Sequence, residues 1–340
     1  MYLGRFREAR EAAVECRRVG PTRAACVFEL SRVLDDQGQC DELETALRDW
    51  EIASPDEPRA PHKLAELLLA TDRPEAAVHE LLDEARARLP APARAGSEQQ
   101  DAELLAWHDG DFALLEKTLR ARDLGDGHWA RQLIDIYLET GRDADALAVA
   151  EEFERKNANM PPAPGTSDGP LFNDPTSDML AMLARGGAIG ADEYHRRRDA
   201  WVHELDTHIG GDYRRQIWAH AYAQPARTAD EAREAVAAMP RYEPLPPFYW
   251  FFVYGDIGRA LVLGGKPELA LPYLERATHR CLARDPRDFY YLGMAEQATG
   301  DRDGACAAYA TAAHRWEHAT PRSLTVERAR AALEALGCPR

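Results

Sequence analysis

The sequence lacks any long apolar segment. Its longest uninterrupted apolar run, Phe248–Tyr254, is far shorter than the roughly 20 residues that cross a bilayer. No basic-then-apolar leader precedes the first expected helix. We therefore expect no membrane partner and a cytoplasmic location.

Cysteine is scarce, with six residues at positions 16, 26, 40, 281, 306 and 338. The closest two are ten positions apart, so no zinc-type pair exists. His203, Glu204 and His208 do not fit a zinc helix either, because its two histidines must be four positions apart. We expect no metal, no cofactor and reduced, half-buried thiols.

Positive charge is also in short supply, with 42 basic against 58 acidic residues and a formal net charge of −16. Such a chain repels a phosphate backbone, which excludes general nucleic-acid binding. Arginine and alanine far outnumber lysine, which is typical of a GC-rich bacterial genome. One basic cluster, Arg196–Arg198 with Arg214 and Arg215, predicts either a solvated face paired with acids or a dock for an acidic peptide.

Strand signals are nearly missing, because alternating runs of β-branched residues do not occur. Apolar residues instead recur with helical spacing in segments of about 12–16 residues, separated by Gly, Pro and Asp. A hydrophobic content of 45% fits a folded chain. The pattern predicts antiparallel helices joined by short turns.

Two turns near the C-terminus, "LGGKPELA" and "ATGDRDGA", share one frame. Gly265 and Gly300 lie 35 residues apart (300 − 265). Equal offsets from them give the pairs Gly258 and Gly293, Ala270 and Ala305, Leu274 and Tyr309, and Ala277 and Ala312. Small residues let two helices approach closely, and the large one fills the space between hairpins.

This frame resembles the tetratricopeptide repeat, a helix–turn–helix unit of 34 residues. The same frame recurs with turns at Gly4, Gly38, Asp72, Gly110 and Gly141. Two less regular hairpins are expected at 177–207 and 212–239. The resemblance implies an all-α, right-handed α-solenoid of about eight or nine hairpins with a C-terminal capping helix.

The expected domain organisation has four parts. They are N-terminal repeats at 1–158, a Pro/Gly-rich segment at 159–176, further repeats at 177–321 and a capping helix at 322–340. The Pro/Gly-rich segment is an inert insertion, a hinge, a lid or a cleavage site. Gly4 sits at the turn of a repeat, so either an unusual end packs around Tyr2, Leu3 and Phe6 or an upstream region precedes Met1.

The C-terminal stretch "GACAAYATAAHRWEHATPRSLTVERARAALEALGC" resembles the repeat-bearing tails of myxobacterial serine/threonine kinases. Its last helix is expected to turn Val326, Ala329, Leu333 and Leu336 inward and a polar face outward, as a solenoid cap requires.

Two segments resemble catalytic or phosphate-binding motifs, but neither motif is complete. "THRCLARDPRDF" resembles a kinase catalytic loop, but Cys281 replaces the catalytic Asp and no other kinase motif is present. "GRALVLGGKPE" resembles a phosphate-binding loop, but Ala260 and Pro267 replace required residues. We expect a protein that is not an enzyme.

The repeat frame predicts which side chains face the concave side. Phe252, Gly255, Arg259 and Val262 share that face, and the next repeat offers Tyr290, Tyr291, Met294 and Gln297. An earlier repeat offers His128, Arg131, Asp135 and Leu138. Aromatic residues, Met and Arg are enriched at interface hot spots. We predict that Phe252, Arg259, Tyr290, Tyr291, Met294 and Arg131 bind a protein or peptide.

The sequence thus predicts a non-catalytic scaffold or adaptor that holds a peptide or protein in a concave groove. A bacterial signalling or regulatory role is expected, as part of a larger, kinase-like protein. Two alternatives remain open. One is a free-standing inhibitor or regulator in a bacterial defence or regulatory pathway, and the other is a small-molecule receptor or enzyme with a pocket between the two halves.

Overall fold

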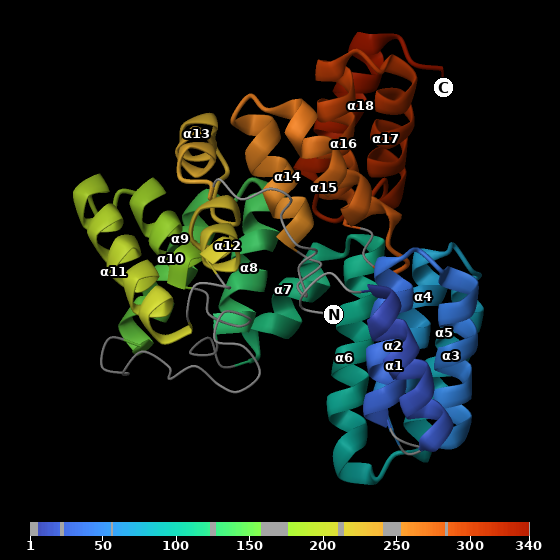
Figure 1. Ribbon diagram of the computed structural model, residues 1–340. Helices are drawn as coiled ribbons and strands as arrows, with labels where there is room; N and C mark the ends of the chain where they lie inside the picture. The colour runs from blue at the N-terminus through green and yellow to red at the C-terminus, as the bar shows by residue number, and fades with distance from the viewer. Residues whose placement is uncertain are drawn as a thin grey trace. The chain divides into compact units, whose positions relative to one another are not determined.

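The computed structural model describes residues 6–20, 24–55, 57–122, 127–157, 176–209, 214–240, 253–282 and 285–339 (Figure 1). Within these ranges the backbone forms helices joined by turns and loops, and no strand occurs there. An isolated backbone bridge joins Asp111 to Thr320. The predicted all-α fold class is confirmed.

The helices group into two compact units. The first contains residues 1–108, 246–251 and 275–285, and the second contains residues 109–245, 252–274 and 286–340. The division expected from the sequence has its boundary at 159–176, which falls almost entirely outside the described residues. That division stays a prediction.

The first unit is a row of antiparallel helices. They are α1 (Phe6–Val19), α2 (Ala24–Asp36), α3 (Cys40–Ala53), α4 (Arg59–Ala70), α5 (Glu75–Arg88) and α6 (Ala91–Asp109), of which only the last residue lies in the second unit. Successive helices from α1 to α5 pack against one another. On α3 the buried residues Leu43, Ala46, Leu47 and Trp50 recur with helical spacing, so one face of the helix is apolar.

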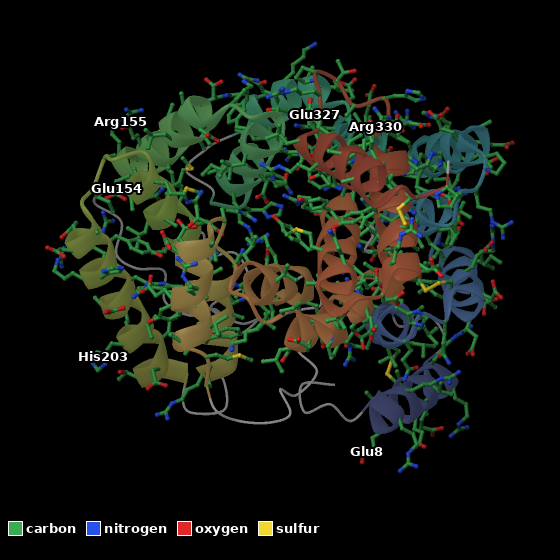
Figure 2. All side chains as sticks on the ribbon, turned by 90° about the horizontal axis from the view of Figure 1, so that it is seen from above. Glu8, Glu154, Arg155, His203, Glu327 and Arg330 are labelled. Carbon is green, nitrogen blue, oxygen red and sulfur yellow. A yellow bond between two sulfur atoms is a disulfide. The ribbon has the colours of Figure 1, made fainter. Side chains whose placement is uncertain are left out.

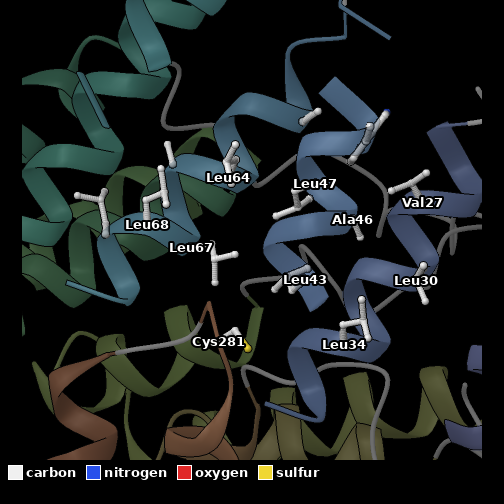
Figure 3. Close-up of a cluster of buried hydrophobic side chains, with 14 of the residues drawn as sticks. Val27, Leu30, Leu34, Leu43, Ala46, Leu47, Leu64, Leu67, Leu68 and Cys281 are labelled. Atoms are coloured by element: carbon white, nitrogen blue, oxygen red, sulfur yellow. The ribbon is translucent and has the colours of Figure 1, made fainter. Parts of the chain in front are cut away.

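These apolar faces form the core of the first unit. Leu43 and Leu47 of α3 and Leu64 of α4 are fully buried in one cluster (Figure 3). Burying a leucine side chain stabilises a fold by about 1.5–3 kcal/mol, so the stacked faces hold the unit together. Cys281 joins the same cluster from far along the chain.

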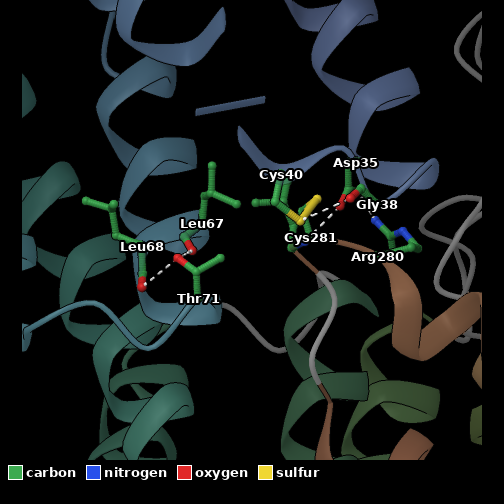
Figure 4. Close-up of a disulfide and its surroundings, with 9 residues drawn as sticks. Asp35, Gly38, Cys40, Leu67, Leu68, Thr71, Arg280 and Cys281 are labelled. Carbon is green, nitrogen blue, oxygen red and sulfur yellow. Dashed lines mark hydrogen bonds and ion pairs between the residues drawn. A yellow bond between two sulfur atoms is a disulfide. The ribbon is translucent and has the colours of Figure 1, made fainter. Parts of the chain in front are cut away.

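The segment after α15 (Pro267–His279) is attached to this unit by a buried acid. Asp35 at the end of α2 forms an ion pair with Arg280, and both side chains are 1% exposed. The Asp35 carboxylate also accepts a hydrogen bond of 2.8 Å from the backbone N–H of Leu282. Cys281 lies between these two residues and is bonded to Cys40 (Figure 4). The segment is therefore fixed by charge, hydrogen bonding and a covalent link at once.

All six cysteines are paired, so the prediction of reduced thiols is wrong. The disulfides are Cys16–Cys26, Cys40–Cys281 and Cys306–Cys338, with Cα–Cα distances of 5.6, 5.4 and 5.7 Å. Sequence spacing could not reveal them, because the partners meet only after the helices have stacked.

The predicted turns are confirmed wherever the structure describes them. Their residues take the left-handed backbone, with φ of 65° at Gly38, 55° at Asp72, 71° at Gly110, 76° at Gly141, 76° at Gly265 and 90° at Gly300. The turn expected at Gly4 lies outside the described residues.

The second unit continues the helical pairs. Its elements are α7 (Phe112–Arg120), α8 (Gly127–Thr140), α9 (Asp143–Asn157), α10 (Thr176–Arg185), α11 (Ala191–Ile209), α12 (Arg214–Trp218), the π-helix η2 (Ala219–Ala223), α13 (Ala229–Ala237), α14 (Val253–Leu263), the first part of α15, α16 (Pro286–Thr299), α17 (Arg302–Arg315) and α18 (Leu324–Leu336). The irregular hairpins expected at 177–207 and 212–239 correspond to α10 with α11 and to α12 and η2 with α13.

Small and large residues meet across these pairs as the repeat frame predicts. A Cβ atom on Gly293 would lie 2.8 Å from the ring of Tyr309, and one on Gly258 would lie 2.4 Å from Cγ of Leu274. Glycine is required at both positions because any side chain would overlap the large residue of the next helix.

The second unit closes on itself. Its last hairpin reaches back to its first helices, because the backbone N–H of Thr320 donates to Gly110 O at 2.9 Å and Phe112 packs edge-on against Trp316. Ser323 and Thr325, at the start of α18, donate hydrogen bonds to the buried carboxylate of Glu139 on α8. Residues from both ends of the helical array therefore share one interior.

The capping helix α18 has the faces that the sequence predicts. Val326 and Ala329 are buried, and Leu333 and Leu336 pack on the core of α17. Its outer face is polar and exposed, and it includes Glu327 and Arg330 (Figure 2).

Candidate functional site

The predicted binding residues fall on three helices of the second unit. Arg131 lies on α8, Arg259 on α14, and Tyr290, Tyr291 and Met294 on α16. Phe252 lies outside the described residues, as does most of the apolar run 248–254. Its described end, Val253 and Tyr254, is buried.

Tyr290 and Met294 face the neighbouring hairpin. Both are half-buried and pack against the apolar cluster that α17 and α18 form, and the ring centroids of Tyr290 and Tyr309 are 5.8 Å apart. The ring of Tyr291 lies 5.2 Å from that of Tyr290. Much of the aromatic area on α16 therefore contributes to packing within the repeat array.

Arg259 is buried and fully engaged. Its side chain is 5% exposed, and its Nη1 is 2.8 Å from Oδ1 of Asp256. Its Nη2 donates to Gln224 O at 2.6 Å and its Nε donates to Ala226 O at 3.0 Å. Arg259 thus supports the chain between η2 and α13 by binding carbonyl groups, and its guanidinium does not reach the surface.

Arg131 belongs to a group that we name the arginine–aspartate cluster. Its members are Arg131, Asp135, Asp178, Arg227, Asp256, Arg259 and Arg287. They come from α8, α10, the loop after η2, α14 and α16. The closure of the second unit brings these elements together, because α10 contacts both α8 and η2 and α14 contacts both η2 and α16.

Two acids organise the cluster. Asp178 accepts a hydrogen bond of 3.1 Å from Nε2 of Gln224, and its Oδ2 lies 3.5 Å from Nε of Arg131. Asp135 accepts a hydrogen bond of 2.8 Å from Nη2 of Arg227, and its Oδ1 lies 3.5 Å from Nη1 of Arg287. Each acid therefore ties elements that are distant in the sequence.

The surroundings shift the pKa values of Asp135 and Asp178 in opposite directions. Burial raises the pKa of Asp178 above its usual range, although Arg131 and Arg227 oppose the shift. Burial acts in the same sense on Asp135, but Arg287 and Arg227 outweigh it and lower the pKa of that carboxyl. Asp135 is therefore held as a carboxylate, whereas ionised Asp178 is less favoured.

A buried polar chain extends from Asp178 into the π-helix. Gln224 donates to Asp178, and the Oε1 of Gln224 lies 2.5 Å from Nδ1 of His220, which is 1% exposed. π-helices are rare overall, and those that occur are frequently found at functional sites. Here η2 carries His220 and is followed directly by Gln224, which contacts Asp178 of the cluster.

Sequence reasoning found part of this site. The repeat frame placed Arg131 and Asp135 on one face of α8, and both belong to the cluster. It missed Asp178, Arg227 and Arg287. Asp178 and Arg227 lie in the less regular hairpins at 177–207 and 212–239, for which the frame gave no register. Arg287 lies on α16, one helical turn before Tyr291, so the frame could have included it.

The basic cluster at 196–198 forms ion pairs on and near α11. Arg196 pairs with Glu193, Arg197 with Glu154 of α9 (labelled in Figure 2), and the buried Arg198 with Glu234. Arg214 pairs with Asp206. Of the two interpretations, these contacts favour a face paired with acids.

Among the described residues, no group of three or more His, Cys, Asp or Glu side chains could hold a metal ion. His203 is exposed on α11 (Figure 2). None of the described helices combines the length and apolarity that crossing a membrane requires.

No protein-family model and no curated protein matches this chain. Among solved structures, it is similar to the P58(IPK) TPR domain, with 13% identity, 99% of this chain and 96% of that chain covered, and a TM-score of 0.21. It is also similar to a tetratricopeptide repeat protein from Parabacteroides merdae ATCC 43184, with 11% identity, coverage of 96% and 93%, and a TM-score of 0.26.

A third similar structure is Naa15/Naa10 bound to HypK-THB, with 14% identity, 98% of this chain and 59% of that chain covered, and a TM-score of 0.24. TM-scores of this size assign neither a family nor a function to the chain. The helical-repeat architecture rests on the helices, turns and contacts described above.

Proposed function

We propose that the chain is a non-catalytic interaction module that binds a protein or peptide segment along the concave face of its helical hairpins. The observation that supports this proposal is the arginine–aspartate cluster. Its Arg131, Arg227 and Arg287 side chains are 26%, 23% and 21% exposed, so they are partly open to a partner. Arginine is enriched at interface hot spots because its planar guanidinium binds carboxylates and stacks on aromatic rings.

The expected partner is a protein or peptide, and nucleic acid is not expected, because a net charge of −16 opposes it. We keep the bacterial signalling role as part of the proposal. It rests on the resemblance of residues 304–338 to the tails of myxobacterial kinases alone.

We further propose that the chain folds in an oxidising compartment and not in the cytoplasm. Disulfides persist in the periplasm, at the cell surface and outside the cell, and they are rare in the reducing cytosol. Pairing of all six cysteines supports this location.

Selection from a display library of random peptides tests the interaction proposal. The full chain is immobilised in its oxidised form, and enriched peptides are remeasured in solution against Arg131→Ala and Arg330→Ala. Arg330 lies on the exposed face of α18 and serves as the control. We expect Arg131→Ala to lose binding and Arg330→Ala to retain it. Failure to enrich any peptide, or equal binding by both variants, would contradict the proposal.

A further inference from the structure

Two arginines of the cluster have hydrogen-bonding capacity that the described residues do not use. Arg131 lies 3.5 Å from Asp178, and its guanidinium donates no hydrogen bond to any described residue. The guanidinium of Arg227 makes one hydrogen bond there, to Asp135. A guanidinium carries five N–H donors. Most donors of these two side chains therefore have no partner among the described residues.

In the same cluster, Arg259 is an arginine whose guanidinium nitrogens all have partners. It is 5% exposed and donates to carbonyl groups through both Nε and Nη2. Arg131 and Arg227 are about five times more exposed, at 26% and 23%. Within the cluster, the Arg259 side chain is therefore closed to a partner, whereas the Arg131 and Arg227 side chains are partly exposed.

The two partly exposed side chains act on the same group. Arg131 contacts Asp178 directly, and the positive charge of Arg227 also stabilises the Asp178 carboxylate. Arg227 in turn contacts Asp135, which lies one helical turn after Arg131 on α8. An oxyanion placed beside Asp178 would thus meet guanidinium donors from α8 and from the loop after η2.

The chemistry of the cluster favours a carboxylate over a phosphate. Both arginines already face carboxylates, and the planar guanidinium matches that group in two-point contact. Asp135, Asp178 and Asp256 lie in the same cluster, so a dianionic phosphate would meet more repulsion than a monoanion. We propose that Arg131 and Arg227 form a binding site for a carboxylate group, supplied by an acidic side chain of the partner segment.

The source of the carboxylate in this inference rests on the proposed function. The experiment tests the carboxylate site and the proposed function separately. Ligand-observed NMR on the full, oxidised chain compares four probes. They are an acetylated and amidated heptapeptide with two central Glu residues, the same peptide with Gln, the Gln peptide with a free C-terminal carboxylate, and succinate. Inorganic phosphate is measured alongside them.

We expect the Glu peptide to bind at least tenfold more tightly than the capped Gln peptide. Arg131→Gln and Arg227→Gln should each abolish that preference, while Arg131→Lys should keep part of it and Arg330→Gln all of it. Circular dichroism confirms that each variant is folded. Arg131→Gln removes the ion pair with Asp178 but no hydrogen bond to a described residue, and Arg131→Lys, which keeps the charge beside Asp178, controls for loss of that pair.

The outcomes distinguish the site from the function. Binding of succinate that Arg131→Gln abolishes, without binding of any peptide, supports the carboxylate site and overturns its peptide source. Equal binding of the Glu and Gln peptides, or phosphate binding tighter than any carboxylate, overturns the site. If the Glu and Gln peptides bind equally, the interaction proposal stands.

Discussion

Cys40 on α3 is bonded to Cys281, which follows α15 and lies 241 positions further along the chain. The bond fixes residues after α15 to the first unit, where Asp35 and Arg280 form a buried ion pair beside it. A cross-link that closes so long a loop restricts the unfolded chain more strongly than a short one.

We predict that Cys281→Ala lowers the free energy of unfolding of the whole chain by about 2–5 kcal/mol. Chain entropy makes this loss about 2 kcal/mol larger than the loss from opening Cys306–Cys338, which closes a loop of 32 positions. Urea unfolding followed by circular dichroism measures both. Peptide mapping under non-reducing conditions should recover the three linkages, and detection of free thiols in the native chain would contradict the pairing.

Gly293 and Tyr309 provide a second prediction. Alanine favours a helix over glycine by about 1 kcal/mol, but a Cβ at Gly293 would lie 2.8 Å from the Tyr309 ring. We expect the overlap to prevail, so that Gly293→Ala lowers stability by about 1–3 kcal/mol.

Gly96 on α6 is the matched control for this substitution. It also lies within a helix, and apart from its chain neighbours and its own helix backbone no atom lies within 4 Å of the Cβ that alanine would add. Gly96→Ala should therefore raise stability by up to about 1 kcal/mol. Thermal unfolding of both variants checks the pair, and a gain in stability at Gly293 would show that α16 and α17 do not approach as described.

Features set by local chemistry could be predicted from the sequence. The turn residues predict a left-handed backbone. The contacts of Gly293 with Tyr309 and of Gly258 with Leu274 follow from the spacing of residues within one hairpin. A repeat frame needs only neighbouring helices, so these contacts were predictable without knowledge of the whole fold.

Features that depend on distant segments could not be predicted. Arg259 has the helix position of a binding residue, but the frame does not say that the carbonyl groups of Gln224 and Ala226 meet it. The pairing of Cys40 with Cys281 has the same origin. Of the candidate site, the frame found Arg131 and Asp135 on α8 and Arg259 on α14, where it gave the register of the helix.

Arg259 itself leads to a third prediction. Replacing it with methionine keeps most of its bulk but leaves Asp256 and three backbone carbonyl groups without their donor. Removal of one partner of a buried pair costs about 3–5 kcal/mol, and we expect a loss of that size for Arg259→Met. Arg330→Met on the exposed face of α18 should change stability by less than about 0.5 kcal/mol. Hydrogen exchange should show faster amide exchange between residues 219 and 228, and unchanged exchange there would contradict the supporting role.

Glu139 yields a prediction about pH. Its carboxylate is buried and accepts hydrogen bonds of 2.6 Å from Ser323 Oγ and 2.8 Å from Thr325 Oγ1. Burial raises the pKa of Glu139 above its usual 4.5, although Arg287 and these hydrogen bonds oppose the shift. The folded chain therefore binds this proton more tightly than the unfolded chain does. The contribution of Glu139 to stability is complete below pH 4.5 and decreases as the pH rises through the raised pKa.

Glu139→Gln removes this titration. The amide N–H groups of glutamine would face donors at the start of α18, so the variant should be less stable than the parent by about 1–3 kcal/mol at pH 4.5. The difference should shrink as the pH rises, because only the parent chain loses stability by ionising there. Urea midpoints between pH 4.5 and pH 8 measure it, with Glu327→Gln on the exposed face of α18 as the control. A constant difference would show that folding does not raise the pKa of Glu139, and a difference that grows with pH would show that Glu139 is stabilised as a carboxylate.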